Sequence, residues 1–333
     1  ALMSLTGLSG DTNGSDGVMT FTGSQAAINA ALASGVKYTP ALNYNGADTL
    51  SATVNDLGEN GSGGALTASQ AIALTVKPIA DTHVVSNLVV NGSFEQPGGG
   101  AGYYAAGSTG LTGWTVTGYD IDYINTAWQA GDGAYSVDLN GFNPGGVQQV
   151  LQTTPGVQYS VGFELSKNPG GGATSVRVSA AGSTQDYAFS AANSSTDMLW
   201  SQQVFNFTAT ASTTTLSFAS TDTRPLIYSF FGSYLGNDPQ GPALDEVVAV
   251  PNAAVNNFIK GAGGDVLQLN GLLTSIDAPH DSTAFTGGYL RFQPSGANTL
   301  VQIDANGGGD GYMTVVTLIG QSLTQADTLN YGL

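Results

Sequence analysis

Hydrophobic and polar residues alternate along most of this chain with a period of two, as they do in half-buried β-strands. The clearest alternating segments are YSVDLN, VQQVLQT, QYSVGFELS, TSVRVSA, QQVFNFTA, TTLSFAST and DEVVAV, all within residues 82–251. Turns rich in Gly, Pro, Asn and Ser separate these segments, and no helical period lies between them. This spacing is typical of a β-sandwich or jelly roll.

The flanking segments alternate in the same way. TLSATVND and AIALTVK precede the middle region, and YLRFQP, TLVQIDA and YMTVVTLIG follow it. SQAAINAALASG predicts one short helix, which Ser24 can cap and Gly35 can end. VKPIADTH is typical of a linker. We therefore predict an all-β protein of three consecutive β domains at residues 1–81, 82–251 and 252–333, the middle one a jelly-roll β-sandwich.

The charge of the chain limits its partners. Only 9% of the 333 residues are charged, and 24 acids against 7 bases give a net charge of −17. Nucleic acid and anionic membrane surfaces need Lys and Arg, so we expect neither partner. We also expect no membrane insertion, because no apolar run is long enough. Unpaired carboxylates in glycine-rich turns instead favour Ca²⁺. The absence of Cys excludes disulfides and thiolate metal sites and fits a secreted protein.

The sequence offers little for catalysis. A nucleophilic triad needs a base, and the only histidines, His83 and His280, lie in linker-like sequence. Paired carboxylates such as Asp120 and Asp122 could in principle cleave a glycosidic bond. An acid catalyst, however, needs a dry pocket that raises its pKa, and a polar glycine-rich loop predicts none. We predict no catalytic residue and no enzyme.

Binding is the better reading of the stretch DYINTAWQAGDGAYSVDLNG. Sugar rings stack on Trp and Tyr, while their hydroxyls bond to Asp, Asn and Gln. Trp128, among polar and glycine neighbours, is expected in an exposed loop, although core packing is the alternative for any single aromatic residue. Trp114 is expected in the core. The predicted residues for binding a glycan or another matrix polymer are Trp128, Tyr123, Tyr119, Asp138 and Trp200.

Three resemblances cover nearly the whole chain. Residues 8–81, with FTGSQAAINAALASGVKYTPALNYNGADTLSATVNDLGENGSGG, resemble a cadherin-like repeat of giant bacterial adhesins. Residues 87–250, with NLVVNGSFEQP, LTGWTV, VQQVLQTTPGVQYSVGFELSKNP and ALDEVVAV, resemble the choice-of-anchor C family, which is related to DUF642 proteins and implies a galactose-binding-like jelly roll. Residues 258–332, with GAGGDVLQLNGLL and LVQIDANGGGDGY, are similar to the C-terminal target domain of type I secreted adhesins. Together they imply the C-terminal region of an RTX-type adhesin, secreted or on the cell surface, involved in cell adhesion and biofilms.

The resemblance also implies calcium sites. Glu95 and Asp245 would share a structural Ca²⁺ of the jelly roll, and the alternative is two unpaired surface acids. DANGGGDG departs from an EF-hand pattern but could wrap a cation, or form a hairpin without one. The metal candidates beyond the Glu95–Asp245 pair are Asp304, Asn306 and Asp310 in that turn, Asp265 in the single RTX-like GAGGDVLQL, and Asp48, Asp56 and Asp81 in the first segment.

An alternative function concerns the first domain. At LMSLTGLSG the sequence begins in the middle of the cadherin-like pattern. We therefore expect the first domain to lack strands and to have an unpaired edge. Upstream residues could complete the sandwich, or the domain could be small and self-sufficient. In a third case a neighbouring copy contributes a strand and links subunits into an extracellular fibre.

Overall fold

A computed structural model describes the chain except residues 12, 42, 43, 45, 60, 61, 78, 223–239 and 310. Contacts divide it into two compact units, Ala1–Ile79 and Ala80–Leu333. Each unit is described by itself.

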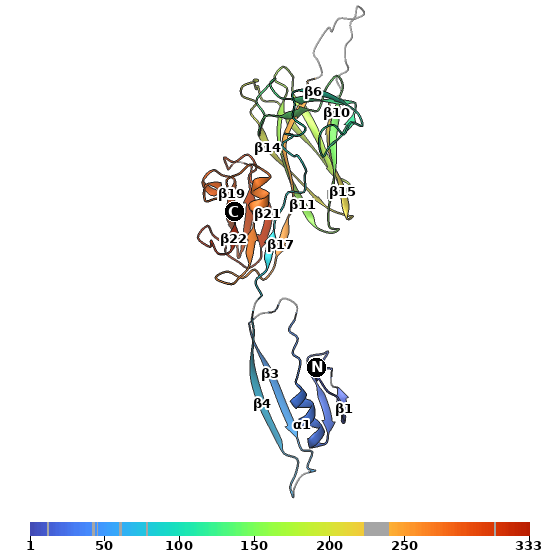
Figure 1. Cartoon of the computed structure of the whole chain (residues 1–333), viewed down its shortest axis with the longest axis vertical. Coiled ribbons are helices and arrows are strands. Elements are labelled where there is room, and N and C mark those ends of the chain that lie inside the picture. Colours follow the sequence, from blue (N-terminus) through green and yellow to red (C-terminus); the bar gives the residue numbers. More distant parts are fainter. Residues whose placement is uncertain are drawn as a thin grey trace, which may run out of the picture. The chain divides into compact units, whose positions relative to one another are not determined.

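In its described residues, the first unit contains one helix and two hairpins, which Figure 1 shows. Its elements are β1 (Leu8–Asp11), β2 (Thr20–Gly23), α1 (Gln25–Ser34), β3 (Gly46–Asn55) and β4 (Thr67–Val76). The predicted helix is confirmed: the Ser24 side chain caps its first turn by accepting from the Ala27 amide, and the Gly35 amide donates to the Leu32 carbonyl. β1 pairs with β2 and β3 with β4, both antiparallel. Among the described residues of this unit, only Leu2 and Ala31 are buried hydrophobics.

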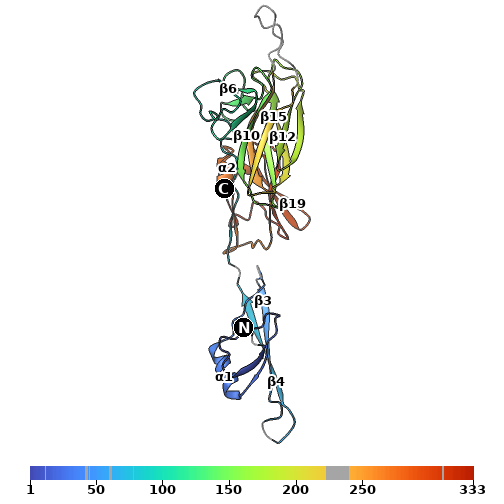
Figure 2. The same cartoon turned by 90° about the vertical axis from the view of Figure 1, so that its right-hand side faces the viewer.

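The second unit begins with a two-sheet sandwich, which confirms the predicted all-β class and jelly-roll architecture (Figures 1 and 2). One sheet has the strand order β13-β12-β15-β10-β7 and the other β14-β11-β16-β9-β8-β6. The strands are β6 (Gly102–Ala105), β7 (Thr115–Gly118), β8 (Asp120–Ile124), β9 (Ser136–Asp138), β10 (Gly145–Gln152), β11 (Gln158–Lys167), β12 (Thr174–Ala180), β13 (Ser183–Phe189), β14 (Ser201–Thr208), β15 (Thr213–Ser220) and β16 (Pro242–Pro251).

Alternation explains the sandwich core. Inward residues of both sheets, such as Val147, Val176 and Phe218 of one and Phe163 and Phe205 of the other, form one buried cluster. Trp114 belongs to this cluster, as predicted. The strands β11 and β16 are buried on both faces, unlike the strands of the five-stranded sheet. The outer face of the six-stranded sheet must therefore be covered.

The C-terminal part of the unit, residues 253–333, covers that face. Val248 and Val250 of β16 belong to its hydrophobic cluster, together with Phe258 and Val316. Its elements are β17 (Ala253–Val255), β18 (Val266–Gln268), α2 (Asn270–Thr274), α3 (Thr283–Thr286), β19 (Leu290–Ser295), β20 (Asn298–Ile303), β21 (Met313–Leu318) and β22 (Tyr331–Gly332). β5 (Thr82–Val84) pairs with β18 in parallel, so His83 lies in a strand of this part rather than in a linker.

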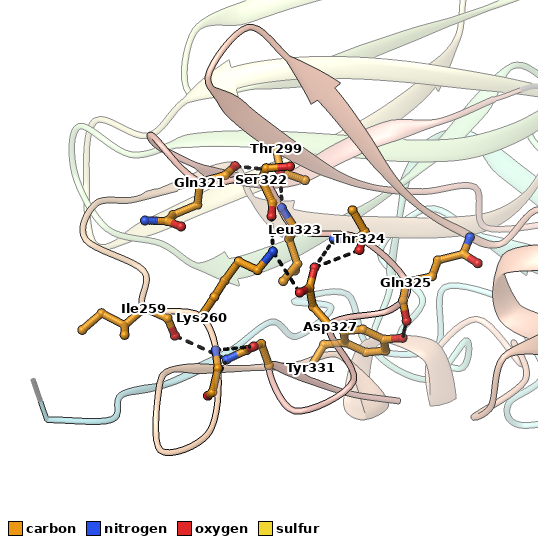
Figure 3. Close-up of polar contacts among 12 residues, drawn as sticks. Ile259, Lys260, Thr299, Gln321, Ser322, Leu323, Thr324, Gln325, Asp327 and Tyr331 are labelled. Atoms are coloured by element: carbon orange, nitrogen blue, oxygen red, sulfur yellow. Dashed lines mark hydrogen bonds and ion pairs between the residues drawn. The ribbon is translucent and has the colours of Figure 1, made fainter.

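Figure 3 shows the polar contacts that hold residues 321–331 against Lys260 and its neighbours. The Lys260 ammonium lies 2.9 Å from Asp327 Oδ1 and donates to the Ser322 carbonyl. The other oxygen of Asp327 accepts from the amide and the hydroxyl of Thr324. In the described part of the chain, no helix is long and apolar enough to cross a membrane.

Candidate functional site

An exposed aromatic patch lies at the β6–β8 edge of the sandwich. Its members are Tyr103, Tyr119 and Phe142, with exposed fractions of 48%, 67% and 46%. The rings of Tyr103 and Phe142 are 5.4 Å apart and tilted by 54°. Asp120 fixes this edge, because it accepts from the Tyr103 hydroxyl and the Asn143 amide. Tyr103 also lies opposite Asp122 in the strand register. The edge thus combines apolar ring faces with carboxylates.

The prediction that Trp128 lies exposed in a loop is wrong. Its side chain is only 6% exposed and packs with Met198 and Ala243. The indole N–H donates to the Ser136 hydroxyl over 2.9 Å, which satisfies its only polar atom. Tyr123 is also buried: its hydroxyl donates to the Phe94 carbonyl and its ring stacks on Tyr135. Neither ring presents a free face to solvent.

The other predicted ligand-binding residues differ in their exposure to solvent. Tyr119 is exposed, as a ligand-binding residue must be. Trp200 is half-buried, and its indole N–H donates to the Gln129 carbonyl. Asp138 is buried and accepts from two backbone amides and the Asn168 side chain. Burial, followed by the nearby Asp122, raises the pKa of Asp138 to about 7. Asp138 therefore lies below the surface, not on it.

Glu95 and Asp245 hold the same loop, residues 131–135. Glu95 Oε1 accepts from the amides of Ala134 and Tyr135 at 2.7 and 2.8 Å. Asp245 Oδ2 accepts from the amides of Gly131 and Asp132. Only glycine fits at position 133, because its φ is +60° and an added Cβ would lie 2.4 Å from Glu95 Oε1. Two carboxylates converging on one loop suit a Ca²⁺ ion chemically. The shared ion itself stays a prediction.

The glycine turn that follows β20 is organised by Asp304. This buried carboxylate accepts from the amides of Gly309 and Gly311. Asn306, in the same turn, donates to Glu164 Oε1 of β11 over 2.6 Å and so joins the C-terminal part to the jelly roll. Asp310, the third predicted ligand, lies outside the described residues.

The remaining metal candidates serve local structure. Asp265 is buried and accepts from the amides of Asp81 and Ile259, which ties β5 to the strand beside it. Asp81 itself is exposed. In the first unit, Asp48 accepts from the Tyr38 hydroxyl and the Thr49 amide, and Asp56 accepts from the amides of Gly58 and Leu66. Their roles as calcium ligands stay predictions.

A polar cavity of about 110 Å³ was missed by the sequence reasoning. It lies within the second unit, where the jelly roll meets the C-terminal part. The residues that line it include Asp132 and Glu246 from the jelly roll and Asp277, Tyr289 and Asn306 from the C-terminal part. Among the described residues, no three Asp, Glu, His or Cys side chains form a ready-made metal cluster. The sequence signal for this cavity was the pair Asp245 and Glu246 in ALDEVVAV. Adjacent residues of a strand face opposite sides of the sheet, so one of the two acids must point away from the other.

Comparisons with known proteins find matches to the residues of the sandwich. Residues 87–248 match the family described as "Protein of unknown function (DUF642)". Halomucin of Haloquadratum walsbyi (strain DSM 16790 / HBSQ001) is 27% identical over 241 residues, which cover 66% of this chain. The chain spans about 2% of the length of that relative.

Solved structures with a similar fold include carbohydrate-binding modules. The CBM22-1 xylan-binding domain of Xyn10C from Paenibacillus barcinonensis is 19% identical, with a TM-score of 0.28, and the match covers 45% of this chain and 92% of that domain. TmCBM61, solved in complex with beta-1,4-galactotriose, is 15% identical with a TM-score of 0.31, covering 50% of this chain and 99% of that one.

Proposed function

We propose that the second unit is a glycan-binding module of a secreted or cell-surface adhesin. The observation that carries this proposal is the aromatic patch of Tyr103, Tyr119 and Phe142. Such side chains bury their rings when they only stabilise a fold, as Tyr123 and Trp128 do here. Three aromatic rings left exposed at one sheet edge are a surface suited to binding.

The chemistry of the patch suits a carbohydrate better than an apolar ligand. A sugar ring has an apolar C–H face, which stacks on Tyr or Phe, and a rim of hydroxyls. Asp122 lies in the strand next to Tyr103 and is half-buried, so its carboxylate can accept from such hydroxyls. A net charge of −17 argues against an anionic polysaccharide. A neutral glycan is therefore the favoured ligand class.

Calcium would act on this module as a structural ion. If Glu95 and Asp245 share a Ca²⁺, the ion holds loop 131–135 and, through it, the end of the sandwich that contains β9. Ion binding to the folded state alone raises stability by mass action, about 2.7 kcal/mol at a hundredfold excess over the Kd. Chelation should therefore weaken glycan binding indirectly, through the fold.

The test is a glycan array with the full chain, followed by titration of the best neutral glycan. Phe142→Ala should weaken binding roughly five- to tenfold, since stacking on one ring contributes about 1–1.5 kcal/mol. Tyr103→Phe keeps the ring face and should bind nearly as well as the wild type. Val150→Ala, exposed on the five-stranded sheet, is the matched control. No glycan binding by the wild type, or equal binding by Phe142→Ala, would reject the proposal.

Self-assembly into a fibre is the second candidate, and the β3–β4 hairpin favours it. Both strands are edges of a two-stranded sheet, and most of their residues are exposed, Val54 and Ile72 included. Exposed strand edges with apolar residues are templates for a further strand. Light scattering separates the two functions, because only the fibre predicts long polymers that form without any glycan.

A further inference from the structure

The cavity between the jelly roll and the C-terminal part contains an acidic side chain with no partner. Glu246 is 3% exposed, and its Oε2 atom is buried without a hydrogen-bond partner among the described residues. A buried carboxylate without a partner is costly, and native structures retain one only where something compensates. Glu246 lines the cavity, so the compensating group can occupy that space.

The backbone of β16 is distorted where it presents Glu246. Asp245 lies opposite Glu164 and Val248 opposite Gly162, so Glu246 and Val247 together face the single residue Phe163. This is a β-bulge, a feature that redirects a side chain and is common beside functional sites. Glu246 also has a φ of +49°, a conformation that is unfavourable for a residue with a side chain. Packing alone would be better served by a regular strand with an apolar residue here.

The charged side chains that line the cavity are all acids. Asp132, Glu246 and Asp277 line it, and its lining includes no Lys, Arg or His. Burial raises the pKa of Glu246 to about 10, with further contributions from Asp132, Glu164, Asp245 and Asp304. The ion pairs of the described residues that involve Arg177, Lys260 and His83 have other acids as partners. Among the described residues, no side chain that lines the cavity supplies a cation to this cluster.

We propose that this cavity binds a divalent cation, Ca²⁺ by its ligand chemistry, which joins the jelly roll to the C-terminal part. The available donors are carboxylate and amide oxygens, the hard ligands that Ca²⁺ prefers, and no nitrogen or sulfur ligand lines the space. Two or three protein oxygens hold the ion and water completes its six to eight ligands, for which about 110 Å³ is ample room. Asp132 and Glu246 come from one side of the junction, and Asp277 and Asn306 from the other.

This site is separate from the ion expected between Glu95 and Asp245. Asp245 precedes Glu246 in the same strand, but its carboxylate accepts from the amides of loop 131–135 and does not line the cavity. The site also makes no use of the aromatic patch. The cation can therefore be tested without any glycan, and failure of one proposal leaves the other standing.

The test is calorimetric titration of the full chain with CaCl₂ after chelation. The wild type should show a binding event that Glu246→Gln abolishes, while Glu95→Gln and Asp186→Asn retain it. Asp186 is a matched control because it is an exposed acid paired with Arg177 on the five-stranded sheet. Absence of calcium binding in the wild type, or unchanged stoichiometry and affinity in Glu246→Gln, overturns the proposal. Either result would mean that the cluster stays protonated without an ion.

A second measurement does not depend on Glu246 variants folding. Tb³⁺ replaces Ca²⁺ at oxygen sites and emits when a nearby aromatic ring transfers its excitation. Tyr289 lines the cavity, so Tyr289→Phe should reduce the Tb³⁺ emission while leaving Ca²⁺ affinity nearly unchanged. Equal emission from the wild type and Tyr289→Phe places the ion elsewhere and counts against the proposal.

Discussion

Replacing Asp138 by Asn should remove one pH-dependent contribution to the stability of the second unit. Asp138 lies at the centre of the six-stranded sheet, between Asp122 of β8 and Ala243 of β16. Its pKa in the folded protein is about 7, against an ordinary value of 3.8, because burial disfavours the ionised form. Asn has the same shape and no charge. The variant therefore removes the titration while preserving the packing.

The magnitude follows from the two pKa values. They differ by about 3, and each factor of ten in proton affinity corresponds to about 1.4 kcal/mol, so ionisation of Asp138 costs the folded state about 4 kcal/mol. Because the folded pKa is raised, this stability is fully present below about pH 4 and is lost as the pH rises to about 7. The Asn variant loses one acceptor toward Asn168, about 1.5 kcal/mol. We expect it to be less stable than wild type at pH 4, equally stable near pH 5, and more stable by about 2–3 kcal/mol at pH 8.

Urea unfolding followed by tryptophan fluorescence measures this effect. All three Trp residues lie in the second unit, so the signal reports only that unit. Titrations from pH 4 to 8 should include a chelator, so that no cation compensates the acids. Asp186→Asn is the control of opposite sign, since Arg177 lowers the pKa of Asp186 and its contribution is lost as the pH falls. A difference between wild type and Asp138→Asn that stays constant with pH would refute the reasoning.

Three further predictions test other parts of the chain. Lys260→Met should destabilise the second unit by about 0.5–1 kcal/mol at pH 7, and by less in 1 M salt. The destabilisation should vanish at low pH, because the pKa of Asp327 is lowered chiefly by its bond to Lys260. Urea unfolding at two salt concentrations and two pH values checks this. Ser24→Ala should cost helix α1 about 1 kcal/mol, seen as faster hydrogen exchange of the Ala27 amide. Trp128→Ala should destabilise the second unit by roughly 3–5 kcal/mol, and an unchanged melting temperature would show that Trp128 is not part of the core.

Local patterns predicted the elements well, because each depends on near neighbours. The strand segments recognised by their alternation are strands, and the helix between Ser24 and Gly35 begins and ends where the capping residues indicated. The pairing of β5 with β18 could not be predicted. It joins residues more than 180 positions apart through a three-residue strand, which is too short for a periodic pattern.

The candidate site was harder to predict, since exposure depends on which distant groups hold a loop. Trp128 has polar neighbours in sequence, which suggested a solvent-exposed loop. In the folded chain, Glu95 and Asp245 hold the adjoining residues 131–135, and the indole packs against Met198 from another part of the chain. Tyr103 and Phe142, the most useful ring pair, lie 39 positions apart and meet only in the folded sheet edge.

The buried acids Asp138 and Glu246 pose the same physical problem with two different solutions. A carboxylate removed from water must be protonated, bonded to donors or paired with a cation. Asp138 has donors at both oxygens and does not line the cavity that Glu246 lines, so protonation near neutral pH suffices. Glu246 has an oxygen without a hydrogen-bond partner among the described residues and lines a cavity that other acids share, so a cation in that cavity would both neutralise the group and give that oxygen a ligand. Added Ca²⁺ should therefore raise the melting temperature of Asp138→Asn as much as that of wild type, and should raise that of Glu246→Gln by clearly less. Equal responses of all three proteins would show that the two acids are neutralised in the same way.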